Sequence, residues 1–285
     1  MIRVTASSHY LETVTEAAPP AALDDALAAS CREVPRRVDR FIQLALLGSA
    51  RCAAGQTLQA DCAVYLGSGL GPLGNTIVTQ EQLLRGHELP KPFNFINTLG
   101  ASAGYYIARN LGLNGQNWFV SRRGMNLDAV LETAWQDLTT GRITQALVGC
   151  VEEAPWPPAQ HRRRLGLPDE ARLAEGSHWL LLERDASTGR VVQEQRYANF
   201  STLEIALEDA VREGDELWCA ANLPASAVEA LRRRFAVTSE ECGHDSPAAA
   251  WLTQRLDASF KGTLRIVSGN DASGWGVWSF GAETV

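Results

Sequence analysis

One short segment of the chain has the layout of a nucleophile site. Residues 117–126, Asn-Trp-Phe-Val-Ser-Arg-Arg-Gly-Met-Asn, begin as an apolar strand and end in a sharp turn, and a helical pattern over 127–138 follows directly. Such an elbow lifts one side chain onto a helix N-terminus, where unpaired backbone N–H groups and the helix dipole favour an anionic nucleophile. The apex residue is Gly124, which has no side chain. The segment therefore predicts the frame of a nucleophilic site without its nucleophile.

The elements that must hold this elbow alternate between strands and helices. The hydrophobic periodicity predicts strands over 2–6, 61–66, 118–120, 145–151, 178–184, 216–220, 263–267 and 276–280. It predicts helices over 21–31, 36–52, 75–85, 101–111, 127–138, 203–212, 226–235 and 246–256, and residues 90–97 fit neither pattern. This alternation predicts a layered α/β fold with a largely parallel central sheet.

Composition excludes several classes of function. The 285 residues carry a net charge of −7, which argues against a general role on nucleic acid or on an anionic membrane. The start of the chain lacks the pattern of a signal peptide, and no apolar run approaches 18 residues, so we expect a cytoplasmic protein with no membrane span. Six cysteines without CxxC spacing predict reduced thiols and no metal site: Cys31, Cys52, Cys62, Cys150, Cys219 and Cys242.

Four segments carry a resemblance to a known family. Residues 115–121, Gly-Gln-Asn-Trp-Phe-Val-Ser, resemble the segment that leads to the active-site elbow of β-ketoacyl synthases. Residues 137–142 and 146–149 are similar to that family's helix end, glycine turn and core strand, and 174–183 to its later Gly-Glu-Gly strand. The resemblance implies a thiolase-like fold with two related α/β halves.

The front of the chain is closer to the non-catalytic, chain-length-factor-like members of bacterial type II systems. Residues 37–46, 66–73 and 92–97 carry this likeness. The resemblance covers 1–184 well and the rest weakly. It implies an N-terminal half over 1–184 and a shortened C-terminal half over 185–285, with a connection at about 185–202.

The residues that catalyse condensation in this family are largely missing here. Gly124 stands where the resemblance places the acyl-accepting cysteine, and the segment that matches the first histidine carries Asn222 instead. His244, in a Gly-His-Asp-Ser run, matches the second histidine, whereas Glu240 and Glu241 replace a nearby lysine. We expect no catalytic residue in this chain. His244 is interpreted as a packing or capping relic, with an active role as the alternative.

The resemblance implies a non-catalytic subunit that pairs with an active β-ketoacyl synthase. Such a subunit stabilises its partner and shapes an acyl tunnel for polyketide, aryl polyene or fatty acyl chains, meeting acyl carrier protein only indirectly. The expected interface residues are Trp118, Phe119, Val120, Arg122 and Arg123, although the two arginines also fit a solvated loop. No cofactor is expected. Two alternatives are an acyltransferase or thioesterase that uses His244, and a homodimeric acyl-binding protein.

Overall fold

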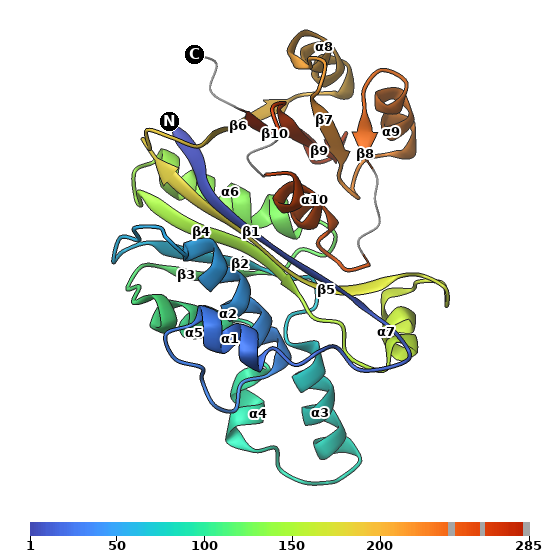
Figure 1. The fold of residues 1–285 in the computed structure, drawn as a ribbon. Helices are drawn as coiled ribbons and strands as arrows, with labels where there is room; N and C mark the ends of the chain where they lie inside the picture. Colours follow the sequence, from blue (N-terminus) through green and yellow to red (C-terminus); the bar gives the residue numbers. More distant parts are fainter. Residues whose placement is uncertain (239–242, 257–259, 282–285) are drawn as a thin grey trace.

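A single continuous sheet organises the computed structural model (Figure 1), which describes residues 1–238, 243–256 and 260–281. The sheet contains two groups of five strands. The first group, from the outer edge inward, is β3 (Asn117–Val120), β2 (Ala63–Gly67), β4 (Gln145–Glu152), β5 (Leu173–Arg184) and β1 (Ile2–Val14). The second group continues outward as β6 (Arg190–Tyr197), β10 (Gly274–Gly281), β9 (Leu264–Asn270), β7 (Glu216–Cys219) and β8 (Val237–Thr238).

The two groups repeat one pattern of order and direction. In the first, β2 is parallel to β3 and β4, β5 is antiparallel to β4, and β1 is antiparallel to β5. In the second, β7, β8, β9, β10 and β6 repeat these relations in that order. The groups join where Arg3 pairs with Val191 and Val4 with Arg190. The expectation of a largely parallel sheet is therefore wrong, because short connections such as the β9–β10 hairpin can only join antiparallel strands.

Helices and strand groups stack in five layers. Helices α1 (Asp24–Ser30), α2 (Arg40–Ala53) and α5 (Ala101–Leu111) cover the outer face of the first group. Helices α6 (Asn126–Thr139) and α10 (Pro247–Arg255) fill the space between the groups, and α8 (Phe200–Ala210) and α9 (Ala225–Arg232) cover the second. Helices α3 (Leu73–Leu84) and α4 (Pro92–Asn97) project from the body in Figure 1, and α7 (Pro158–Leu165) follows β4. The α/β, thiolase-like layering expected from the sequence is confirmed.

Strand β2 shows how the sequence builds these layers. Val64 and Leu66 pack with α2 and α5, whereas Ala63 and Tyr65 pack with α6. Successive side chains of a strand point to opposite faces, so a continuous apolar run serves two cores at once.

Three local expectations need correction. Strand β1 extends to Val14 instead of ending near residue 6, because its polar residues pair along the whole of β5. Residues 92–97 form α4, with Pro92 in the first turn, where a missing N–H costs nothing. The connection expected at about 185–202 contains β6 and the start of α8. The division at 184/185 stays a prediction, which the repeated strand pattern supports.

Two further findings concern the whole described chain. Within the residues that the structure describes, no helix is long and apolar enough to cross a membrane. Five of the described cysteines are free thiols, and burial raises the pKa of Cys52 and Cys62 to about 12, that of Cys219 to about 11, and that of Cys150 well above its ordinary value. Cys242, like Glu240 and Glu241, lies outside the described residues.

Candidate functional site

The elbow has the predicted strand–turn–helix form. Strand β3 ends at Val120, α6 begins at Asn126, and Gly124 between them has φ +71°, in the left-handed region that favours glycine. A Cβ atom added at Gly124 would lie 3.4 Å from the Cβ of Ala221. The elbow apex therefore faces the 220–222 segment, as a nucleophile faces its partner residue in a catalytic site.

Asn222, expected near the elbow in place of a histidine, has a structural hydrogen bond. Its Oδ1 accepts from the backbone N–H of Gly269 at 3.1 Å, which ties the residue after β7 to the end of β9. An amide in this position holds the backbone and supplies no titratable nitrogen.

A buried carboxylate, Glu152, organises the inner wall of the site. It lies at the end of β4, and its Oε1 accepts from the backbone N–H of Gly69 at 2.8 Å and from Nδ2 of Asn126 at 3.0 Å. The same oxygen accepts from Oγ of Ser246 at 2.6 Å, and Oε2 accepts from Oγ of Ser68 at 3.0 Å. Burial raises the pKa of Glu152 to about 7, although these hydrogen bonds act in the opposite direction.

Asn126 connects Glu152 to the elbow. Its Oδ1 accepts from the backbone N–H of Arg122 at 3.0 Å, which closes the turn before α6. Its Nδ2 donates to the backbone oxygen of Asp245 at 3.2 Å and to Oγ of Ser246 at 3.1 Å. One side chain thus fixes the elbow to the 243–246 segment.

The anion-favouring position of the elbow holds a carboxylate of the same chain. Asp245 lies 3.6 Å from Nε of Arg123, and a side chain at Gly69 would overlap its carboxylate. Burial raises the pKa of Asp245, while the nearby Arg123 guanidinium and Gly124 backbone N–H lower it. A negative charge of the same chain therefore lies beside the backbone N–H that could stabilise a substrate oxyanion.

His244 belongs to a line of three histidines. The backbone N–H of Ser246 donates to Nδ1 of His244 at 3.1 Å, which leaves the His244 proton on Nε2. That Nε2 lies 3.1 Å from Nε2 of His178, which must accept, so the His178 proton is on Nδ1 and faces Oγ1 of Thr253 at 3.3 Å. His9, the cross-strand neighbour of His178, lies 3.1 Å from the same hydroxyl through Nδ1. This arrangement requires neutral imidazoles.

Burial lowers the pKa of all three rings. The pKa of His178 falls well below its ordinary value, that of His244 falls to about 3, and that of His9 is also lowered. Electrostatic repulsion between the rings lowers these pKa values further, because a proton on one ring disfavours a proton on the next. At neutral pH the trio carries no cation that could polarise a substrate carbonyl, although a neutral Nε2–H remains a hydrogen-bond donor.

Acidification is expected to destabilise the protein through His178. Its pKa is lower in the folded than in the unfolded chain, so its contribution is complete above about pH 6.5 and is lost as the pH falls. At pH 5 the loss amounts to about 2 kcal/mol. The raised pKa values of Glu152 and Glu153 change the stability in the opposite direction as the pH falls. The stability of the wild type alone therefore does not isolate His178, and wild type is compared with a variant. The gap in unfolding free energy between wild type and His178→Gln should shrink by this amount between about pH 7 and pH 5.

Gln56→Asn provides the control for that measurement. Gln56 is exposed and has no titratable group, so the gap between this variant and wild type is expected to stay constant over the same range. A His178→Gln gap that also stays constant would mean that His178 is not held neutral by its surroundings.

The expected interface residues differ in their surroundings. Trp118 is 49% exposed on β3, whereas Phe119 packs against the α2 and α5 core and Val120 against the α6 core. Arg122 pairs with Glu132 at 3.7 Å, and Arg123 pairs with Asp245. Their assignment to an interface stays a prediction.

Sequence reasoning missed Glu152, Asp245 and His178. Each lies in or next to a predicted element or site residue. Glu152 ends the apolar strand β4, Asp245 follows His244, and His178 begins the predicted strand at 178–184. A charged residue directly after an apolar strand was the available signal for Glu152. Such a position lies at the carboxyl end of the parallel strands, where the elbow also lies.

Comparisons with known proteins place this geometry in a fold class. No family model and no curated protein sequence matches the chain. Solved structures do match, and they show the thiolase-like fold shared by ketosynthases and chain length factors. The chain resembles a structure described as the ishigamide ketosynthase/chain length factor with a TM-score of 0.71 and 18% identity, over 98% of each chain.

Two further solved structures have a similar fold. The first is a type II polyketide acyl-carrier protein in complex with its ketosynthase bound to the hexaketide, with a TM-score of 0.64, 13% identity and 99% of each chain covered. The second is 3-oxoacyl-(acyl carrier protein) synthase III from Pseudomonas aeruginosa PAO1, with a TM-score of 0.56 and 13% identity, over 100% of this chain and 99% of that one. At these identities the likeness establishes the fold.

Proposed function

We propose that the chain is a non-catalytic subunit that pairs with an active β-ketoacyl synthase and helps to shape its acyl tunnel. The substrates of the pair would be acyl chains on a carrier protein, in polyketide, aryl polyene or fatty acyl elongation. The observation that carries the proposal is an exposed apolar surface beside the edge strand β3.

We call this surface the apolar face. Ten of the fifteen large apolar side chains that are exposed in the described part of the chain belong to it: Val78, Leu83, Leu84, Leu89, Phe93, Phe95, Ile96, Leu99, Tyr105 and Trp118. They lie on or between α3, α4, α5 and β3, and each of these elements contacts the next. A gathering of exposed apolar side chains on neighbouring elements is typical of a protein–protein contact, so the face supports association with another protein.

The edge of β3 adds a second reason for pairing. Among the described strands β3 pairs only with β2, so its outer edge presents backbone N–H and C=O groups to a neighbour. Such an edge is a template for strand addition, and Trp118 stands beside it. A partner strand could extend the sheet while the apolar face is buried.

The closed elbow supports the non-catalytic part of the proposal. Gly124 supplies no nucleophile, Asn222 supplies no imidazole, and the Asp245 carboxylate beside the elbow would repel an acyl oxyanion. Both ring nitrogens of His244 have partners within the chain. No observation favours the acyltransferase alternative, which needs a nucleophile beside His244.

The direct test is co-expression of the chain with a candidate ketosynthase, followed by size measurement of the purified material and analysis of the acyl products. A one-to-one complex that elongates carrier-bound chains, together with an inactive chain when expressed alone, is the expected result. A stable lone monomer that leaves the ketosynthase unbound and its products unchanged would exclude the proposal. A stable homodimer carrying acyl chains would favour the acyl-binding alternative.

Restoring a thiol at the elbow is not expected to restore condensation. A cysteine at position 124 must adopt φ near +71°, which costs about 1–2 kcal/mol for a residue with a Cβ. The Asp245 carboxylate would raise the pKa of the new thiol and so lower its nucleophilicity. Gly124→Cys should therefore form no acyl-enzyme, as judged by mass spectrometry after incubation with an acyl carrier thioester.

Gly166→Cys is the matched control for the backbone cost. Gly166 has φ +69° and no atom within 4 Å of an added Cβ, so its substitution isolates the strain of a left-handed backbone. Equal losses of unfolding free energy in the two variants are expected. Acyl transfer to residue 124 would show instead that the elbow retains a working oxyanion site.

A further inference from the structure

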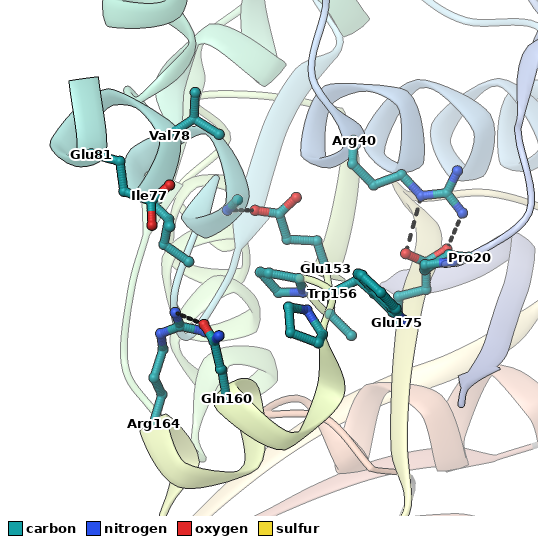
Figure 2. A pocket seen from close by; sticks show the side chains of 14 residues that line it. Pro20, Arg40, Ile77, Val78, Glu81, Glu153, Trp156, Gln160, Arg164 and Glu175 are labelled. Atoms are coloured by element: carbon teal, nitrogen blue, oxygen red, sulfur yellow. Dashed lines mark hydrogen bonds and ion pairs between the residues drawn. The ribbon is translucent and has the colours of Figure 1, made fainter. Parts of the chain in front are cut away.

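A cavity lies on the side of β4 opposite to the hydrogen bonds that join Glu152 to the elbow. Its volume is about 520 Å³, within the range of small-molecule sites. Its walls come from the start of α3, from the segment after β4 and from α7 (Figure 2). Strands β2 and β4 are neighbours whose chain connections leave in opposite directions along the sheet, and the carboxyl ends of such strands form the crevice where open α/β sheets bind ligands.

The cavity contains one carboxyl group without a cationic partner. Glu153 is 6% exposed, and its Oε1 accepts from the backbone N–H of Gly74 in the first turn of α3. Its Oε2 has no hydrogen-bond partner among the described residues. Figure 2 shows this carboxyl beside the ion pair of Arg40 and Glu175, which satisfy each other. Arg164 lies at the far side, bound to Gln160.

The other walls are apolar. Ile77 and Val78 of α3 line the cavity, as do Pro155, Trp156 and Pro157 from the segment after β4. An alkyl chain of several carbons would fit between these walls and exclude water from them.

We propose that this cavity binds a small primary alkylamine, with its ammonium group on Oε2 of Glu153 and its alkyl chain between α3 and Trp156. A buried carboxyl oxygen without a hydrogen-bond partner, in a cavity that Ile77, Val78 and Trp156 also line, is complementary to a cation on an apolar chain, and an alcohol or a carboxylic acid of the same length lacks that charge. The site is separate from the elbow, and it adjoins the apolar face because Val78 belongs to both.

Binding involves a proton as well as the amine. Burial, with smaller contributions from Asp39 and Glu175, raises the pKa of Glu153 to about 8, although the N–H of Gly74 and the charge of Arg40 act in the opposite direction. Glu81 and Arg164 also line the cavity. When the ammonium group arrives, the O–H bond of Glu153 breaks, the proton passes to the buffer, and an N–H···O⁻ hydrogen bond forms. Alkylamines, like lysine, stay protonated up to about pH 10.

The test is calorimetric titration of the wild-type protein with n-hexylamine, in two buffers of different ionisation enthalpy. At about pH 7 the binding of one amine should release roughly 0.9 proton, and below about pH 8 the affinity should fall roughly tenfold per pH unit. Hexan-1-ol and hexanoate, which share the chain length, should bind much more weakly. These arms need no variant.

Two variants locate the charge. Glu153→Gln keeps an oxygen for the N–H of Gly74 but removes the negative charge, so hexylamine should then bind like hexan-1-ol, with no proton release. Glu170→Gln removes an exposed carboxylate that does not line the cavity and should leave hexylamine binding unchanged. Equal binding of amine and alcohol to wild type, or proton release that survives in Glu153→Gln, would overturn the proposal.

Discussion

Replacing Trp118 by aspartate is expected to weaken the complex with a ketosynthase partner roughly a hundredfold, corresponding to about 3 kcal/mol. The indole ring is half exposed on β3, beside the unpaired strand edge and within the apolar face. Buried tryptophans carry much of the binding energy at protein interfaces, and a carboxylate in the same place would be desolvated without a partner. Titration of labelled partner into each variant measures the change.

Ile205→Asp is the matched control for that experiment. Ile205 is 58% exposed on α8, on the outer layer opposite the apolar face, so the same change from apolar to charged should leave the complex intact. Far-ultraviolet circular dichroism checks that both variants fold. If the two variants weaken the complex equally, or if neither does, the interface lies elsewhere.

Removal of the Glu152 side chain is expected to cost about 3 kcal/mol or more of unfolding free energy. Glu152→Ala leaves three buried donors without this acceptor, the N–H of Gly69 and the hydroxyls of Ser68 and Ser246, and it removes one of the three acceptors of Nδ2 of Asn126. These donors belong to three separate segments of the chain. Without Glu152, the hydrogen bonds that hold the three segments together are lost at the same time. Urea unfolding at about pH 8, where Glu152 is mostly ionised, measures the loss.

A graded series separates this network from a general effect of cavity formation. Glu152→Gln keeps the oxygen that accepts from Gly69, Asn126 and Ser246, and the hydroxyl of Ser68 can turn to accept from the new amide, so the loss should be about 1 kcal/mol. Glu170→Ala, at an exposed position, should change stability by less than about 0.5 kcal/mol. Similar losses in the Ala and Gln variants of Glu152 would show that packing, and not hydrogen bonding, dominates.

The elbow could be predicted from the sequence because its signals are local. A short apolar strand, a glycine and a helical pattern fall within twenty residues, and the left-handed backbone at Gly124 requires the residue type that the sequence shows there. The identity of the group that fills the elbow could not be predicted in the same way. Asp245 is more than a hundred residues away, and only the packing of α10 between the two strand groups brings it to Arg123.

The elements that were missed lack the periodicity on which prediction depends. Strand β6 contains charged and amide residues along its length and reads as a polar linker, yet β10 pairs with all of it except its first residue. Helix α4 is only six residues long and has exposed apolar side chains, so neither length nor amphipathicity identifies it. Their structure is set by neighbours in space, which a single sequence does not reveal.

The end of β4 places two adjacent carboxyl groups on opposite sides of the sheet, Glu152 toward the elbow and Glu153 toward the cavity. Because the faces alternate with every residue, inserting or deleting one residue before this point would exchange the two groups. Glu152 would then face the cavity, where it lacks its hydrogen-bond donors, and Glu153 would face the elbow. Substitutions can accumulate along this strand during evolution, but its length has almost no freedom to drift.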